Sequence, residues 1–153
     1  MNILGKKIWK NKNFLYLCKM ENRIILNRAK CNKCDDIITS YHRHDYVSCK
    51  CGAVAVDGGT EYLKRTGEIS DVTEMSIYSS APYETIRENY HRGGRGINGD
   101  QPLTWVPLSK MNDEWLAACI TYNEERGMGD SFANKMYSKE IEYRKENNIK
   151  IIE

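Results

Sequence analysis

Residues 31–52 have the sequence CNKCDDIITSYHRHDYVSCKCG, which holds four of the six cysteines of the chain in two close pairs. Two residues separate Cys31 from Cys34, and one residue separates Cys49 from Cys51. Two thiolate pairs on a loop that folds back on itself can close a tetrahedral Zn²⁺ site, and such a site contributes folding free energy directly. The spacing therefore predicts two metal-binding knuckles and one structural zinc ion per chain, bound by these four cysteines.

The second knuckle is less regular than the first. Most knuckles place two residues between their ligands, whereas only Lys50 lies between Cys49 and Cys51. A neutral imidazole is also a good zinc ligand, so His44 or His42 can substitute for one cysteine. The alternative for both histidines is a solvated position in a hairpin turn. Four protein ligands leave no open coordination position, which is typical of structural sites and not of metal-assisted hydrolysis.

Charge is unevenly distributed along the 153 residues, whose formal net charge is +2. Residues 1–20 contain five lysines and no acid, so the remainder holds 18 basic and 21 acidic residues. A body with an excess of acid lacks the overall charge of proteins that bind nucleic acid through its phosphates. The 41% hydrophobic content can supply a modest core, which favours one compact domain or a small module with an appendage.

The use of cysteine bears on the compartment. Four cysteines are grouped in knuckles, while Cys18 and Cys119 stand apart in apolar surroundings, a pattern that favours metal binding in a reducing compartment over disulfides. The apolar run at residues 14–18 is too short for a signal-peptide core or a membrane span. We therefore expect a cytoplasmic protein that does not contact a membrane.

Residues 1–19 show no hydrophobic period, because their few apolar side chains are scattered among lysines and asparagines. We expect a flexible basic arm here. One interpretation is a segment that contacts a membrane or nucleic acid, and the other is a frayed terminus or upstream extension. Met20 offers an alternative start of the chain.

Residues 20–66 are expected to form a zinc ribbon of short antiparallel strands. β-Branched and aromatic residues mark these strands, and Gly58 with Gly59 marks the turn between the last two. Residues 37–41 and 45–49 are expected to pair as a hairpin around the histidines. The expected strands are 23–28, 37–41, 45–49, 53–57 and 61–65.

Residues 67–153 are expected to form a mixed segment that packs on the ribbon and ends in a helical pair, so that the whole chain is α+β. Asn112 is predicted to cap the first of these helices and Gly127 to end it, and Asp130 or Ser131 to cap the second, which runs to about residue 147. Pro82 favours the first turn of an earlier, short helix. The remaining expected strands are 74–78, 103–108 and 149–152.

The most glycine-rich stretch of the chain is residues 91–100. Backbone amides exposed by glycine, together with nearby arginines, can bind an anion or a partner. The residues that this hypothesis assigns are Arg92, Gly93, Gly94, Arg95 and Gly96. The alternative is a connector whose glycines adopt positive φ, with Asn98-Gly99 as a hairpin turn. No P-loop lysine follows the glycines.

The sequence contains no recognisable catalytic constellation. The three histidines, His42, His44 and His91, belong to no nucleophile or metallohydrolase motif, and the acidic residues are spread along the chain. We therefore expect that the protein is not an enzyme. The enzyme alternative requires a cleft with convergent polar groups beside the loop at residues 92–100.

Several stretches resemble small zinc-ribbon proteins of unassigned function that tailed bacteriophages encode. The strongest likeness is carried by residues 27–34, 44–59 and 62–65, and a weaker likeness by residues 92–96, 102–108, 123–125 and 143–144. The arm at residues 1–19 lies outside it. The resemblance implies a viral accessory protein in the bacterial cytoplasm, with zinc on the four cysteines, and it implies no activity.

A host or viral protein is the partner that we expect. Zinc ribbons bind either proteins or nucleic acids, so the fold alone does not decide. Residues 23–65 contain eight basic and five acidic residues, enough for a local basic patch, but the rest of the body is acidic and would repel phosphate. Nucleic acid is therefore the alternative partner.

Overall fold

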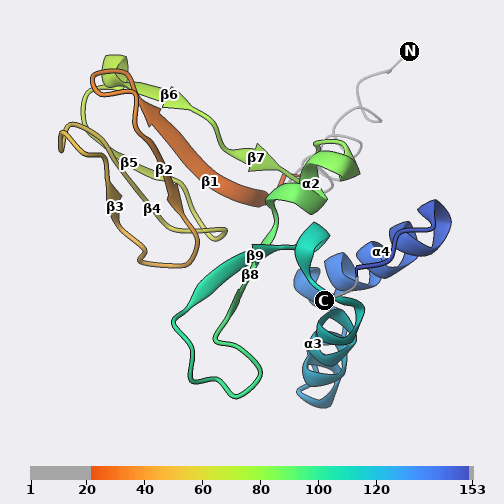
Figure 1. Cartoon of the computed structure of the whole chain (residues 1–153). Helices are drawn as coiled ribbons and strands as arrows, with labels where there is room; N and C mark the ends of the chain where they lie inside the picture. Colours follow the sequence, from red (N-terminus) through yellow and green to blue (C-terminus); the bar gives the residue numbers. More distant parts are fainter. Residues whose placement is uncertain (1–21, 152–153) are drawn as a thin grey trace, which may run out of the picture. The chain divides into compact units, whose positions relative to one another are not determined.

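The computed structural model describes residues 22–151 and has the α+β class that the sequence predicts, with antiparallel strands first, a mixed segment next and helices last (Figure 1). The chain forms two compact units, one that ends at Ile86 and one that begins at Arg87. The arm at residues 1–19 lies outside the described residues. That the C-terminal segment packs on the ribbon stays a prediction.

Strand β1 (Ile24–Cys31) is the centre of the first sheet and pairs antiparallel with three others. It pairs with β2 (Ile37–Ser40) through residues 27–30, with β6 (Val72–Glu74) through residues 29–31, and with β7 (Ile77–Tyr78) through Ile24 and Leu26. A 3₁₀ turn, η1 (Ile69–Asp71), precedes β6.

The strand predicted at residues 74–78 is therefore interrupted. Between β6 and β7 the hydroxyl of Ser76 accepts a hydrogen bond from the Arg28 backbone N–H at 3.1 Å. The backbone N–H of Ser76 donates in turn to the Glu74 carboxylate at 3.0 Å. Side-chain hydrogen bonds thus replace part of the backbone hydrogen-bond ladder to β1 at the residues between β6 and β7.

The second sheet contains β3 (Val47–Ser48), β4 (Ala55–Asp57) and β5 (Lys64–Thr66), all antiparallel. The predicted return of the chain after Gly58 and Gly59 is confirmed, because β5 pairs with β4. These glycines have φ of +108° and +53°, respectively, values that L side chains rarely adopt.

The predicted hairpin of residues 37–41 with 45–49 is wrong. Strand β2 pairs with β1 and strand β3 pairs with β4, so the connection between them crosses from one sheet to the other. The chain leaves the first sheet because the Tyr41 backbone N–H donates to the Asp45 carboxylate at 2.7 Å instead of continuing a ladder. His44 then turns the backbone with φ of +62°.

One hydrophobic core cluster of the first unit combines residues of both sheets. Its residues are small or β-branched, and two of them are cysteines from the knuckles. The first sheet contributes Ala29, Cys31 and Ile38, and the second sheet side contributes Cys49, Val54 and Val56. Such a small core gives limited hydrophobic stabilisation, so further links between the sheets matter.

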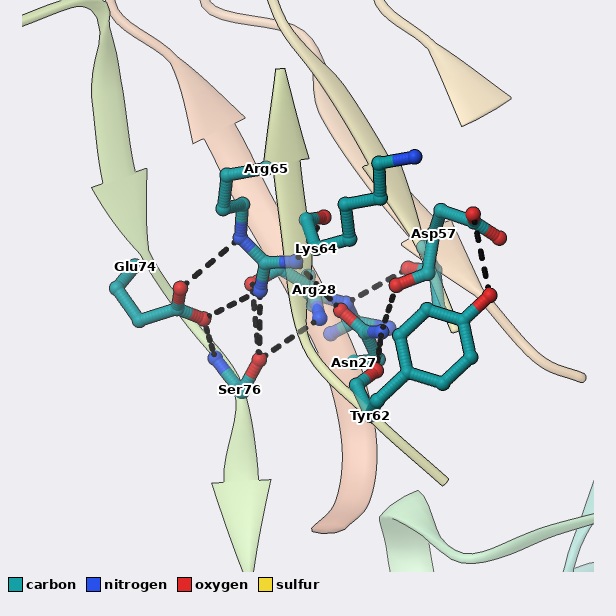
Figure 2. A network of polar contacts seen from close by, with 9 residues as sticks. Asn27, Arg28, Asp57, Tyr62, Lys64, Arg65, Glu74 and Ser76 are labelled. Carbon is teal, nitrogen blue, oxygen red and sulfur yellow. Dashed lines mark hydrogen bonds and ion pairs between the residues drawn. The ribbon is translucent and has the colours of Figure 1, made fainter. Parts of the chain in front are cut away.

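A polar network joins the same two sheets (Figure 2). The fully buried amide of Asn27, on β1, donates to the backbone oxygens of Asp57 at 2.9 Å and Tyr62 at 3.1 Å. Its Oδ1 accepts from Arg65, on β5, at 2.8 Å. Arg65 also makes a two-bond contact with the Glu74 carboxylate, at 3.0 and 2.8 Å. Every polar atom of the Asn27 amide is therefore satisfied by the opposing segments.

The second unit begins within helix α2 (Tyr83–Asn89), the short helix predicted after Pro82. A two-stranded ribbon follows, in which β8 (His91–Gly94) pairs antiparallel with β9 (Thr104–Pro107). The 3₁₀ turn η2 (Leu108–Lys110) then leads to α3 (Asp113–Glu125) and α4 (Phe132–Asn147).

The predicted helix caps are confirmed. The Asn112 side chain accepts from the Trp115 backbone N–H at 2.8 Å, and Gly127 has φ of +70° just after α3. Ser131 caps α4 by accepting from the Asn134 backbone N–H at 3.2 Å. Asn148 ends α4 in a left-handed conformation.

The strand predicted at residues 149–152 is wrong for residues 149–151, which are not in a strand, and residue 152 lies outside the described residues. The Ile149 backbone N–H donates to the Arg144 carbonyl at 2.9 Å, so it completes the end of α4 instead.

A buried ion network lies at the centre of the second unit. The Glu140 carboxylate is fully buried and accepts from Arg87 at 2.7 Å and from Arg144 at 2.8 Å. Arg144 also donates to Asp113 at 2.7 Å and to the Leu108 backbone oxygen at 2.7 Å. The network therefore connects α2, η2, α3 and α4. Each charged side chain in it contacts a side chain of opposite charge, and Arg144 also contacts a backbone carbonyl.

Candidate metal centre

The four cysteines of the two knuckles converge at one end of the first unit. Cys31 is the last residue of β1, and Cys34 lies in the turn before β2. Cys49 and Cys51 lie in the turn between β3 and β4. Each sheet therefore supplies one pair, and the prediction that these residues come together is confirmed.

Local backbone geometry shapes each knuckle. In the first, the Cys31 backbone N–H donates to the Asp36 carbonyl at 2.9 Å, and Asp35 turns the chain with φ of +58°. In the second, the Gly52 backbone N–H donates to the Cys49 carbonyl at 2.9 Å. Gly52 has φ of +74° and open space around a Cβ position, so the conformation and not crowding calls for glycine.

The sulfur positions match a tetrahedral site. All four Sγ atoms lie within 4.8 Å of one another, with Cys31 to Cys51 at 3.7 Å and Cys49 to Cys51 at 3.5 Å. A zinc–thiolate bond of about 2.3 Å places the sulfurs of a tetrahedron about 3.8 Å apart. A disulfide needs about 2.05 Å, and the cysteines are free thiols. The four thiols can therefore hold one metal ion.

The pKa values of three of the four thiols are shifted, and not all in the same direction. Burial raises the pKa of Cys49, but the Val54 backbone N–H, 3.3 Å from its sulfur, and the neighbouring thiols lower that pKa to about 6. Backbone N–H groups of Asp36 and Cys51 lower the pKa of Cys34. The Ala53 N–H lowers the pKa of Cys51, yet hydrogen bonds with the other thiols raise it to about 12.

The physical cause of this asymmetry is that four thiolates cannot crowd together without a cation. The raised pKa of Cys51, the most exposed of the four, favours its protonated form beside the other sulfurs. A divalent metal supplies the missing positive charge and displaces that proton. The cluster can therefore hold a divalent cation, and binding would release protons.

Asp36 joins the two knuckles, and the sequence analysis missed its role. Its carboxylate accepts from the Lys50 backbone N–H at 3.0 Å and lies 3.6 Å from the Lys50 ammonium. Its backbone also contacts Cys31 and Cys34 of the first knuckle. The only sequence signal was an acidic residue directly after a knuckle, and that signal is common in turns.

The histidines considered as substitute ligands lie elsewhere. His44 Nδ1 is 3.2 Å from the Tyr62 hydroxyl, and that hydroxyl donates to Asp57 at 3.3 Å. His42 Nε2 lies 3.9 Å from the Asp45 carboxylate. The group of ligand atoms found among residues 22–151 consists of the four cysteines.

The glycine-rich stretch has two parts. Gly96 and Gly99 have positive φ, as the connector interpretation expects, whereas Gly93 and Gly94 are extended residues of β8. Arg92 and Arg95 are exposed, and Arg92 lies close enough to the Cys119 thiol to oppose the rise in pKa that burial causes there. Anion or partner binding by this stretch stays a prediction.

Comparison with known proteins gives one match. A family model described as a domain of unknown function, DUF7695, matches residues 23–67. The match covers β1 to β5 and therefore includes both knuckles. No curated protein and no solved structure shows a significant match to the chain. The family description assigns neither an activity nor a source, so the phage origin suggested by the resemblance stays a prediction.

Helices in the described part of the chain are all too short or too polar to cross a membrane.

Proposed function

We propose that this protein is a zinc-stabilised binding module that acts on a protein partner. The observation that carries the proposal is the closed set of four cysteine sulfurs, which joins two small sheets at one end. Four sulfur ligands in tetrahedral arrangement favour zinc among the metals available to a protein. With no coordination position left for a substrate, the ion holds the fold together and leaves recognition to the protein surface.

Charge pairing supports a protein partner over nucleic acid. Most of the basic side chains around the knuckles face an acidic partner, which lowers the positive charge available to phosphates. The pairs are Lys30 with Asp35 at 2.6 Å, Lys33 with Asp71 at 2.7 Å, Arg43 with Glu61 at 3.6 Å, and Lys50 with Asp36 at 3.6 Å. Residues 22–86 contain eight basic and nine acidic residues, so this described part of the first unit has no excess of positive charge.

The resemblance to phage zinc-ribbon proteins adds a biological setting to this proposal. In that setting the protein is a viral accessory factor in the host cytoplasm, and its partner is a host or viral protein. Such a factor needs a stable scaffold of small size more than it needs a catalytic site.

Two measurements test the proposal. Elemental analysis of purified protein should find about one zinc per chain, and absence of metal from material purified without chelator would exclude the structural role. Affinity capture from host cells, with and without nuclease, should retain a protein whose binding survives nuclease treatment. Duplex or single-stranded DNA binding that falls steeply with salt and weakens on replacing Arg23, Arg28, Lys30, Lys33, Arg43 and Lys50 would favour the nucleic-acid alternative instead.

A further inference from the structure

A groove of about 580 Å³ lies within the second unit, between the β8–β9 ribbon and α3. Its volume is in the range of ligand-binding pockets. The residues that line it are mainly apolar or small: Gly94, Gly96, Ile97, Thr104, Val106, Asn112, Glu114, Trp115 and Ala118. None of them belongs to the first unit, so the groove is independent of the metal centre.

The glycine at position 94 forms one wall of this groove. A Cβ atom there would lie 2.9 Å from Cζ2 and 3.0 Å from Cη2 of Trp115, closer than side chains tolerate. The absence of a side chain thus lets the indole ring lie directly against strand β8. Trp115 remains half-exposed as a result and presents its ring to the groove.

The groove is open at its rim. Ile97, at the end of the β8–β9 ribbon, is fully exposed, and Thr104, Glu114 and Ala118 are also exposed. An open groove of this kind does not enclose a small molecule on all sides, but it accommodates side chains that project from a larger surface. A solvent-exposed isoleucine beside a half-exposed tryptophan is the composition of an interaction site.

Glu114 decides the charge of the occupant. Glu114 is the one charged residue among those that line the groove. Its side-chain carboxylate makes no hydrogen bond or ion pair within the described part of the chain. A carboxylate beside an indole ring attracts a cationic side chain in two ways, through charge and through the negative face of the ring. The apolar lining at Ile97 and Val106 favours an aliphatic or aromatic neighbour.

We infer that this groove binds a segment of the protein partner that presents an arginine or lysine next to an apolar side chain. The inference rests on the proposed function, because it names the surface and the chemistry by which a protein partner is recognised. The cation contacts Glu114 and the Trp115 ring, and the apolar side chain packs against Ile97 and Val106.

The test uses full-length, zinc-loaded protein and fluorescently labelled seven-residue peptides. One peptide alternates arginine with leucine, a second replaces arginine by glutamate, and a third replaces leucine by serine. Fluorescence anisotropy should show saturable binding of the first peptide and at least about tenfold weaker binding of the other two. Equal binding of the acidic peptide would overturn the inference.

Variants of α3 locate the binding. Glu114→Gln should weaken the arginine–leucine peptide about fivefold, and Glu114→Lys should reverse the preference toward the acidic peptide. Glu125→Gln, an exposed acid on the same helix outside the groove, should leave binding unchanged. If Glu125→Gln weakens binding as much as Glu114→Gln does, the attraction is diffuse and the groove is not the site.

A steric pair separates the groove from the rest of the helix. Ala118→Tyr fills the groove and should abolish peptide binding, whereas Ala117→Tyr, exposed on the same helix but outside the lining, should have no effect.

Capture from host cells distinguishes failure of the groove inference from failure of the proposed function. If the wild-type protein captures a protein and Ala118→Tyr captures it equally well, the groove inference is wrong and the proposed function stands. If the zinc-loaded wild-type protein captures none, the proposed function itself is wrong.

Discussion

Asn27 is a fully buried polar residue whose three side-chain hydrogen bonds all reach the segment from Asp57 to Arg65. It lies on the central strand of the first sheet, and the groups it contacts lead into or belong to the second. Four residues further along β1, Cys31 belongs to the cluster of four cysteines that comes from both sheets. Individual polar side chains therefore hold the two sheets together, a role that a larger hydrophobic core has in a bigger domain.

We expect Asn27→Leu to lower the free energy of unfolding by about 3 kcal/mol, because the Arg65 guanidinium and two backbone carbonyls lose their partner. Urea unfolding of the zinc-loaded protein measures this. Lys64→Ala, which changes an exposed neighbour of Arg65, should stay within about 0.5 kcal/mol of the wild type. Similar losses in both variants would mean that the Asn27 amide has no special role.

Gly94 and Gly99 allow two kinds of glycine to be separated. Gly94→Val should cost about 2 kcal/mol and change the near-ultraviolet circular dichroism, because the new side chain collides with the Trp115 ring. Gly99→Ala places a side chain in open space at φ of +72°, so it should cost about 1 kcal/mol and leave the aromatic signal unchanged. An unchanged aromatic signal in Gly94→Val would contradict the packing of Trp115 against β8.

At the scale of elements, the second unit depends on charges that meet away from water. Helix α4 buries polar and charged residues, among them Glu140 and Arg144, beside its apolar Met136 and Tyr137. Glu140 and Arg144 on this helix contact residues from α2, η2 and α3. Because each of these groups is paired, the desolvation penalty is offset only while the whole set stays together.

We expect Glu140→Gln to destabilise the second unit by about 3–5 kcal/mol, since Arg87 and Arg144 would remain without the carboxylate that neutralises them. Circular dichroism at 222 nm during urea unfolding follows α3 and α4 directly. Glu142→Gln, on the exposed side of α4, is the matched control and should shift the transition by no more than about 0.5 kcal/mol. A small effect of Glu140→Gln would show that water reaches the network.

At the scale of the whole molecule, the chain joins a unit with a candidate metal centre to a unit whose buried groups lie far from the four clustered cysteines in the sequence. The core cluster beside the cysteines consists of few and small residues, so we expect metal binding to supply a large part of the stability of the first unit. The second has two capped helices and its own ion network. The two units should therefore respond differently to loss of the ion.

Removal of metal by a chelator should expose the backbone of residues 24–78 while α3 and α4 keep their structure. Hydrogen exchange followed by mass spectrometry measures both in one experiment, and a large increase in exchange is expected for β1 to β7 only, because β6 and β7 pair with β1. Restoring zinc should reverse the change. A uniform increase over residues 113–147 as well would mean that the chain unfolds as one cooperative body.

The sequence by itself determined what depends on neighbours in the chain. Cysteine spacing was enough to predict the cluster of four cysteines, because a knuckle is closed by residues a few positions apart. Asn112, Ser131 and Gly127 were enough to delimit the two long helices, because capping satisfies backbone groups within one turn. The α+β class followed from the same local patterns.

Only the tertiary structure decided which distant groups meet. β2 and β3 are consecutive strands, yet they pair in different sheets, and each sheet thereby supplies one cysteine pair to the cluster. Asp36 and Asn27 gained their roles from contacts across the fold, which no local pattern records. Glycine at positions 93 and 94 of β8 leaves room for the rings of Trp105 and Trp115, which come later in the chain. Propensity and spacing act over a few residues, whereas packing is decided where separate segments come into contact.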